Sequence, residues 1–308
     1  MLRSAAVGSR IRVKLPHRLV PERAKRLDVR VAEGVECVMT DFDWVPEGVD
    51  ITVPSVARAY DYMLGGAHNL AVDRAMADQA AKVLPSTPRL VRMNRAYLRR
   101  VVTHLVESGI DQFLDIGSGI PTVGNVHEVA PDARVVYVDK DPVAVAHSEL
   151  LLSGNDKTAV VQGDLRNPED LLSRPEVLGL LDFDRPVAVL MLMVLHFVPD
   201  EDEPWRLVAR YRDHVVPGSY LAISHVTDDR QSAAWRGVAR TAAQSRDSLN
   251  NRSHAEIAEF FEGFELQEPG LVGCGLWRPQ GRGDISDNAD ENALIYAGLG
   301  LKPESGSR

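Results

Sequence analysis

The residues of this chain that could do chemistry gather around a glycine turn. In the stretch FLDIGSGIPTVGN, residues 113–125, an apolar run ends at Asp115 and is followed by Gly117 and Gly119. A dinucleotide site needs a third glycine three residues later, so that a helix N-terminus can meet the pyrophosphate, but Thr122 stands at that position. The two glycines still let a ligand approach the backbone closely, and Asp115 places a carboxylate beside it. The turn therefore favours a ligand that has a nucleoside and no phosphate.

Two more acids follow the next two apolar runs of the chain. VYVDKDP contains Asp139, which comes 24 residues after Asp115, near the separation at which an acid reaches a ribose diol. VQGDLR contains Asp164, which can accept a hydrogen bond from an adenine amino group, and Leu165, which can pack on the ring. Any one of these acids alone is more often a turn residue or a helix cap than a ligand contact. Taken together, and with no Lys or Arg in the turn, they favour a cationic ligand over a polyphosphate.

S-adenosylmethionine meets these requirements, because it joins an adenosine and an amino acid through a positively charged sulfonium. We therefore expect it as the cofactor. The expected cofactor contacts in this region are Asp115, Gly117, Ser118, Gly119, Asp139, Lys140, Asp164 and Leu165.

The hydrophobic pattern predicts the elements that position these residues. Helical spacing of apolar residues extends over three helices from Thr52 to Gly109. Short apolar runs then alternate with helical stretches, which predicts right-handed βαβ units and a parallel sheet covered by helices on both faces. The runs are QFLDIG, ARVVYVD, TAVVQGD, PVAVLMLMVLHF and GSYLAISHV. Ligands bind at the carboxyl ends of such strands, which is where the three acids lie.

The remaining pattern predicts the helix starts and the end of the chain. Asp141 is expected to cap a helix that has Pro142 at its first position, and Ser253 with Glu256 forms a capping-box pattern. Beyond the fifth strand, residues 228–262 read as a helical insertion that would contact a substrate. FELQEPGLVGCGLWRP and NALIYAGLGLK predict two further strands.

The composition is that of a globular protein with an acidic body and a basic leader. Of the 308 residues, 44% are hydrophobic and 26% are charged, and no apolar run is long enough to span a membrane. Residues 1–38 carry a net charge of +5, so the remaining 270 residues carry −14 of the total of −9. An acidic body repels a phosphate backbone, so we expect no nucleic-acid partner. Because no apolar run has spanning length, we expect no membrane partner either. Cys37 and Cys274 cannot form a disulfide framework, which fits a cytoplasmic protein.

The chain resembles the class I S-adenosylmethionine-dependent methyltransferases, and within them an actinobacterial S-adenosyl methyltransferase family. The resemblance covers about residues 44 to 303. It rests on the strings TVPSVARAYDYMLGGAHNLAVDR, NRAYLRR, QFLDIGSGIPTVGNVHEVA, RVVYVDKDPVAVAH, VVQGDLR, LHFVPDED and GSYLAISHVT. It implies a Rossmann-like, seven-stranded methyltransferase sheet with an antiparallel last strand, helices on both faces and an N-terminal helical cap. It supplies no substrate.

The resemblance also bears on the organisation of the chain. Members of the family begin a few residues before a W-x-P-x-G-x-D segment, here WVPEGVD, so Met39 is the expected natural start. We expect residues 1–38 to be a disordered basic leader or a mis-assigned start, and residues 39–110 to be the helical cap. Residues 111–303 would form the S-adenosylmethionine-binding domain, and residues 304–308 a tail.

Methyl transfer requires alignment of the acceptor and, for a hydroxyl or amine, removal of a proton. His196 follows the fourth strand and His225 ends the fifth strand, so each is a candidate base. The alternative for either histidine is a structural role. In YDYMLGGAHN and the residues before it, Arg58, Tyr60 and Asn69 could close over the methionine part of the cofactor, with Arg58 on its carboxylate. Packing of Tyr60 onto the sheet is the equal alternative for this segment.

The acceptor is expected to be a small molecule of unknown identity. Trp235, Phe260, Phe261 and Trp277 could line its pocket, although aromatic residues at this spacing more often belong to a core. No metal site is expected, because no His/Asp pair has ligand spacing on one helix. Two other functions stay open: a non-catalytic protein that binds S-adenosylmethionine, and an NAD(P)-dependent oxidoreductase.

Overall fold

The computed structural model describes residues 45–122, 124–227, 229, 233–243, 245, 247–281 and 289–304, without the side chains of residues 233–235. These residues belong to one unit, Val45–Arg308. The expected leader, residues 1–38, and the first residues of the expected cap lie outside the described residues.

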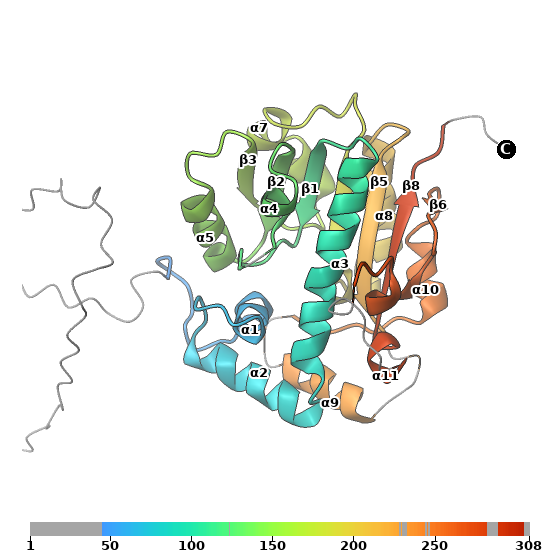
Figure 1. The fold of residues 1–308 in the computed structure, drawn as a ribbon. Coiled ribbons are helices and arrows are strands. Elements are labelled where there is room, and N and C mark those ends of the chain that lie inside the picture. The colour runs from blue at the N-terminus through green and yellow to red at the C-terminus, as the bar shows by residue number, and fades with distance from the viewer. Residues whose placement is uncertain are drawn as a thin grey trace, which may run out of the picture. The chain divides into compact units, whose positions relative to one another are not determined.

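The centre of the fold is a mixed sheet in the order β3-β2-β1-β4-β5-β8-β6 (Figure 1). Strands β1 to β5 are parallel, and β8 lies antiparallel between β5 and β6. This arrangement confirms the predicted Rossmann-like sheet with its antiparallel last strand. The strands are β1 Gln112–Ile116, β2 Arg134–Asp139, β3 Thr158–Gln162, β4 Ala188–Leu192, β5 Tyr220–Val226, β6 Glu265–Leu266, β7 Val272–Gly273 and β8 Ile295–Leu301.

One detail of the sheet differs from the sequence prediction of seven strands. The stretch read as a single strand, residues 264–279, contains two short strands, β6 and β7, and β7 pairs with β8 off the main path. Pro269 and Gly270 lie between them, and the Gly270 N–H donates to the carbonyl oxygen of Gln267 at 2.8 Å to close a turn. Gly270 has a φ of 86°, which glycine adopts without strain.

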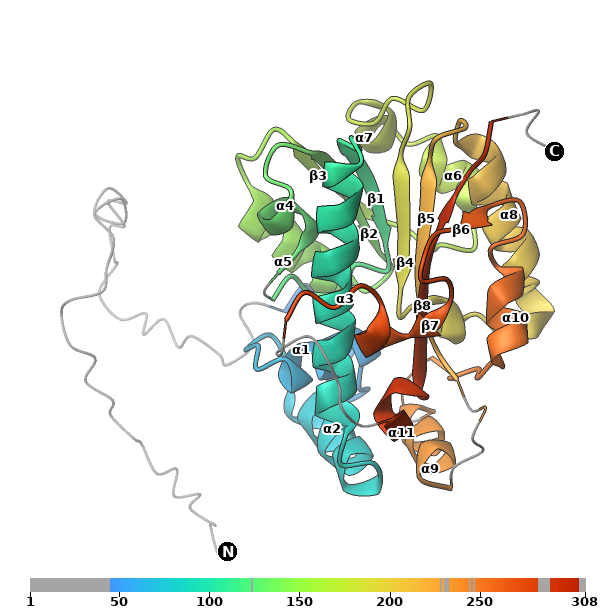
Figure 2. The same ribbon diagram turned by 45° about the vertical axis from the view of Figure 1, so that its right-hand side comes forward.

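Helices cover both faces of the sheet because successive strand residues point to opposite sides. Phe113 packs into the core on one face, and Leu114 packs into the core on the other. The first face is covered by α3 Thr87–Glu107, α4 Val126–Val129 and α5 Pro142–Leu152. The second face is covered by α6 Pro168–Leu172, α7 Pro175–Leu178, α8 Pro204–His214 and α10 His254–Glu259 (Figure 2).

The helices begin where the sequence places capping residues. The Asp141 carboxylate accepts a hydrogen bond from the backbone N–H of Val143 at 2.8 Å, with Pro142 at the first position of α5. Ser253 and Glu256 form the predicted capping box at the start of α10. Both helix starts are therefore confirmed.

A second group of helices lies beyond the carboxyl ends of the parallel strands. It contains α1 Val56–Met63, α2 Ala71–Val83 and α9 Ala233–Ala242, and α2 packs against both α1 and α9 (Figure 1). The long helix α3 runs from this group along the face of the sheet (Figure 2). The N-terminal helices thus serve two purposes, since α1 and α2 cap the strand ends while α3 completes a sheet layer. The short helix α11, Ala289–Asn292, precedes β8.

Of the helices in the described part of the chain, none has both the length and the apolar composition needed to cross a membrane.

Candidate functional site

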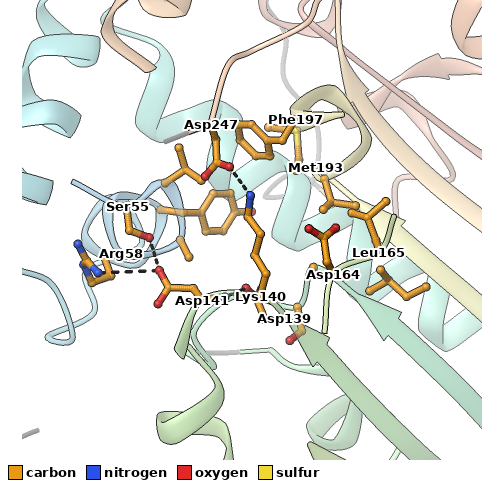
Figure 3. A pocket seen from close by; sticks show the side chains of 18 of the residues that line it. Ser55, Arg58, Asp139, Lys140, Asp141, Asp164, Leu165, Met193, Phe197 and Asp247 are labelled. Atoms are coloured by element: carbon orange, nitrogen blue, oxygen red, sulfur yellow. Dashed lines mark hydrogen bonds and ion pairs between the residues drawn. The ribbon is translucent and has the colours of Figure 1, made fainter. Parts of the chain in front are cut away.

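A cavity of about 430 Å³ lies at the carboxyl ends of β1 to β4, under α1. Its volume falls within the range of sites that enclose one small molecule. The wall is formed by the turns after these four strands, by the chain leading into α1, by α1 and α3, and by Asp247. Figure 3 shows Asp141 facing Ser55 and Arg58, and Asp164 on the other side of Lys140.

Most of the residues expected to contact a cofactor line this cavity. They are Arg58, Tyr60, Asp115, Gly117, Ser118, Gly119, Asp139, Lys140, Asp164 and Leu165. Asn69 does not line it. Its side-chain amide donates to Asp61 at 3.0 Å and to the carbonyl oxygen of Gly66 at 2.9 Å, so Asn69 holds the turn after α1.

Both glycines of the turn after β1 are needed for geometric reasons. Gly117 has a φ of 72°, and a Cβ there would lie 2.4 Å from the side chain of Val194. Gly119 has a φ of 68°, and its N–H donates to the Asp139 carboxylate at 2.7 Å. Apart from its own chain neighbours, no atom of the described residues lies within 4 Å of the position that a Cβ at Gly119 would take. The turn therefore leaves open space above its second glycine, where a ligand can approach the backbone.

Asp115 is a buried acid with no hydrogen-bond partner among the described residues. Only 5% of its surface is exposed, and its side chain lines the cavity. Burial raises the pKa of Asp115 to about 7; the charge of Arg95 opposes this shift, and the charge of Asp139 adds to it. A carboxylate in this state is stabilised by a ligand that carries a positive charge.

Asp139 is held in place by two backbone groups. Its carboxylate accepts from the N–H of Gly119 and from the N–H of Asp141, the latter at 2.9 Å. Burial raises the pKa of Asp139 to about 6, although the two hydrogen bonds act in the opposite direction. The acid at the end of β2 is thus fixed in orientation and faces the cavity (Figure 3).

Asp164 differs from these two acids because it has a basic partner. The Nε of Arg166 lies 3.0 Å from both carboxylate oxygens of Asp164, and Arg166 also pairs with Asp202 at 3.2 Å. The hydrogen bonds from Arg166 lower the pKa of Asp164. The neighbouring Leu165 also lines the cavity, and its carbonyl oxygen accepts from the Tyr211 hydroxyl at 2.8 Å.

Arg58 is committed to the protein itself. Its Nε donates to Asp73 at 2.7 Å and its Nη2 donates to the carbonyl oxygen of Val53 at 2.8 Å, while Nη1 lies 3.9 Å from Asp141. Ser55 donates to the same Asp141 carboxylate. These contacts fasten the start of α1 to the start of α5, so Arg58 is anchored between two acids.

Tyr60 closes a buried polar chain that links three elements. Ser224 of β5 donates to the side chain of Asn94 at 2.6 Å, and the Asn94 amide donates to the Tyr60 hydroxyl at 2.9 Å. That hydroxyl donates in turn to the carbonyl oxygen of Val91 at 3.2 Å. Burial raises the pKa of Tyr60, so its hydroxyl stays protonated. The ring and Asn94 both line the cavity.

Arg95 is a cavity residue that the sequence prediction missed. Its guanidinium lies 5.7 Å from the centre of the Tyr60 ring, and its Nη1 has only a long 3.4 Å contact with Asn125. Its Nε is buried without a hydrogen-bond partner, and no ion pair to Arg95 occurs within the described ranges. A buried donor of this kind calls for an acceptor from outside the chain. The string NRAYLRR contained Arg95, but helical spacing alone does not tell which arginine of α3 faces a cavity.

The two candidate histidines have different surroundings. His196 lines the cavity in the turn after β4 and is 1% exposed. Burial lowers its pKa well below the usual value, and the neighbouring charges of His225 and Arg252 act in the same direction. The imidazole is therefore neutral, with Nδ1 buried and without a partner in the described part of the chain.

His225 lies behind His196, outside the cavity lining, with ring centres 5.5 Å apart. Its Nδ1 donates to the carbonyl oxygen of Val226 at 2.6 Å, and its Nε2 accepts from Arg252 at 3.0 Å. Burial lowers the pKa of His225 to about 3. Because both ring nitrogens are engaged inside the protein, the structure gives His225 no access to a ligand.

The aromatic residues considered for an acceptor pocket lie elsewhere. Phe260, Phe261 and Trp277 are buried in the two cores and do not line the cavity. The side chain of Trp235 lies outside the description. Across the described ranges, no three His, Cys, Asp or Glu side chains are grouped so that they could hold a metal ion.

Comparison with known proteins places this geometry in a family. Residues 42–303 match the family model described as S-adenosyl methyltransferase. The chain is similar to a solved DUF574 family protein of Streptomyces avermitilis, with 39% identity, 82% of this chain and 100% of that chain covered, and a TM-score of 0.78. It is also similar to a candidate methyltransferase of Thermobifida fusca, with 41% identity, coverage of 85% and 99%, and a TM-score of 0.79. No curated protein matches the chain.

The burial of Asp115 predicts a pH-dependent effect on stability. Its pKa is higher in the folded protein, about 7, than in the unfolded chain, 3.8, so its contribution to stability is fully present below 3.8 and is lost as the pH rises through 7. Asn cannot ionise, so Asp115→Asn should melt above the parent at pH 8, by roughly 2–8 °C. The difference should shrink at pH 5.5. Thermal melts at the two pH values check this.

The control is Asp132→Asn, because the Asp132 side chain is fully exposed and lies far from the cavity. It should change the melting temperature equally little at both pH values. A stabilisation by Asp115→Asn that is the same at pH 5.5 and pH 8 would attribute the effect to packing and contradict the ionisation argument.

Proposed function

The chain belongs to the S-adenosyl methyltransferase family, and from this premise we propose that it binds S-adenosylmethionine in the cavity and transfers the methyl group to a small-molecule acceptor. The observation that supports the cofactor best is the charge arrangement of the wall. Within the part of the chain that the structure describes, Asp115 and Asp139 form no ion pair, and Arg95, whose charge acts on Asp115, forms none either. S-adenosylmethionine offers an ammonium group to Asp115, a carboxylate to Arg95 and ribose hydroxyls to Asp139, so it complements these three groups.

The residues fit the cofactor from one end to the other. Asp139, fixed by two N–H groups, would accept hydrogen bonds from the ribose hydroxyls, as the acid at the end of a second strand does in nucleoside sites. Leu165 would pack against the adenine, next to Asp164. The open space above Gly119 would allow close approach of the nucleoside.

The methionine end of the cofactor would lie toward α3. Arg95 would donate to the carboxylate through its unpartnered Nε, and Asp115 would bind the ammonium group. This proposal replaces Arg58 in the carboxylate role, because Arg58 already pairs with Asp73 inside the protein. Binding of a cation beside Asp115 would favour its ionised form and offset the burial that raises its pKa.

S-adenosylmethionine supplies a methyl group that its sulfonium already activates. The protein then has to align an acceptor and exclude water. Met193 and Phe197 follow β4 and give the cavity apolar wall beside His196. A neutral imidazole at this position could accept a hydrogen bond or a proton from an acceptor hydroxyl or amine, so we propose His196, and not His225, for that role.

A dinucleotide cofactor is not favoured. The pyrophosphate of a dinucleotide binds at the N-terminus of a helix that follows the glycine turn directly. Here the next helix, α4, begins only at Val126 and is four residues long. Thr122 takes the position of the missing third glycine. Its hydroxyl donates to Asp61 of α1 at 3.0 Å, so it contacts the cap.

The proposed cofactor is tested by isothermal titration calorimetry of the parent and of Asp139→Ala with S-adenosylmethionine and with NAD. The parent should bind S-adenosylmethionine and not NAD. Asp139→Ala should weaken binding by about 1–3 kcal/mol, the range for lost hydrogen bonds to a charged group. An unchanged affinity in this variant would remove Asp139 from the ribose contacts, and a parent that binds only NAD would refute the proposed function.

The orientation of the cofactor is tested with two ligands that differ in the amino acid part. S-adenosylhomocysteine has the carboxylate, whereas 5′-methylthioadenosine lacks it. Arg95→Met should weaken the first ligand roughly 10- to 150-fold and change the second less than about twofold, because only the first makes the charge-assisted bond. Arg92→Met, an exposed arginine one turn earlier on α3, is the matched control. Equal weakening of both ligands would place the carboxylate elsewhere.

The role of His196 is tested by His196→Gln. The variant should keep its affinity for S-adenosylhomocysteine, while turnover of an acceptor found by screening with methyl-labelled cofactor should fall by about 10²–10⁴. Because its pKa lies well below the usual value, His196 should cause no inflection in the parent's rate between pH 6 and 9. If the variant turned over the acceptor at the parent's rate, His196 would not be the base, and the protein would act by aligning the acceptor.

A further inference from the structure

The side chain of Lys140 extends across the cavity to Asp247, a residue that is part of no recognisable sequence motif. It follows Asp139 at the end of β2, and its Nζ pairs with the carboxylate of Asp247, between α9 and α10. Both residues line the cavity. In Figure 3 the Lys140 side chain runs up to Asp247, with Ser55 and Arg58 on one side of it and Asp164 and Leu165 on the other.

The chain that carries Asp247 is fixed at its other end. We call residues 247–252 the strap. The backbone N–H of Asn250 donates to the carbonyl oxygen of His196 at 2.7 Å. The Arg252 side chain, 2% exposed, donates to the carbonyl oxygens of Leu195 and Val198 at 3.1 and 2.7 Å. The strap is therefore joined to the turn after β4, and Asp247 extends from it toward β2.

The ion pair of Asp247 with Lys140 fixes the position of the Lys140 side chain and adds little to the stability of the fold. The Lys140 side chain is 50% exposed, and ion pairs at such exposure add little to the free energy of unfolding. The lysine stem is flexible, so without this partner the ammonium would not be held in one position at the cavity. With the partner, the methylene stem stays against the cavity.

The pair also sets the charge balance of the cavity wall. Among the described residues, four Arg and Lys side chains line the cavity, and three of them have an acidic partner. Arg58 pairs with Asp73, Arg166 with Asp164, and Lys140 with Asp247. Without Asp247, the Lys140 ammonium would be an uncompensated positive charge beside a ligand that is itself a cation. Like charges at this range repel each other by an amount that salt screens.

We propose that Asp247 is a positioning residue for the cofactor, which holds Lys140 across the cavity and neutralises its ammonium so that a sulfonium can bind beside it. This inference rests on the proposed function. According to this proposal, the strap helps the protein to distinguish the cofactor from its product. S-adenosylmethionine carries the sulfonium charge, and S-adenosylhomocysteine lacks it.

The test compares the affinities of the full-length protein for these two ligands by calorimetry. In Asp247→Asn, the affinity for S-adenosylmethionine should fall about three- to tenfold more than the affinity for S-adenosylhomocysteine, because only the first ligand is repelled by the exposed ammonium. The double variant Lys140→Met/Asp247→Asn should return the ratio of the two affinities to the parent's value. The difference should shrink in 1 M salt.

The control is Asp132→Asn, which removes the same charge from an exposed ion pair with Lys157, away from the cavity. It should leave the ratio unchanged. An unchanged ratio in Asp247→Asn, equal weakening of both ligands, or an equal shift in the control would each overturn the inference. If the parent binds neither ligand, the proposed function itself fails, and this inference falls with it.

Discussion

The hydrogen bond from the Gly119 N–H to the Asp139 carboxylate joins the two turns on which the site is built. It fixes the turn after β1 to the end of β2, and the second oxygen of the same carboxylate accepts from Asp141, which caps α5 and receives Ser55 from the capping segment. Gly119 donates this hydrogen bond from a backbone with a positive φ, which glycine adopts without strain. The cavity, the helix α5 and the cap are thus joined through two neighbouring carboxylates, those of Asp139 and Asp141.

The same site works against the stability of the fold. Burial raises the pKa of both Asp115 and Asp139, because a charged carboxylate loses its hydration there. An amide side chain cannot ionise and would avoid this cost. Acids that raise the energy of the free protein are stabilised when a cation arrives, so the arrangement is more consistent with ligand binding than with packing.

The fold and the strand-end acids could be predicted from sequence because both depend on local pattern. Apolar runs of strand length, separated by helices, specify a parallel sheet, and the residues that end those runs then meet at one edge. The other contacts depend on pairings between segments distant in the chain. The sequence predicts Arg58 as a ligand residue, but its guanidinium pairs with Asp73, 15 residues further along the chain. Arg95 looks like any other charged residue on a long helix, and Asp247 pairs with Lys140 although 107 residues separate the two in the sequence.

The turn after β4 packs directly against the glycine turn after β1. Met193 adopts a φ of 56°, a left-handed conformation that costs a non-glycine residue roughly 1 kcal/mol or more. Its N–H donates to the carbonyl oxygen of Ser224 at 2.9 Å, and the next residue, Val194, packs where a Cβ of Gly117 would be. The missing side chain at Gly117 therefore admits Val194, and the strained turn that follows presents Met193 and His196 to the cavity. Strain of this kind persists only where the surrounding contacts enforce it. Here those contacts come from the ends of β1 and β5, the two strands on either side of β4. The position of the proposed acceptor wall is thus set by the same glycine turn that shapes the proposed cofactor site.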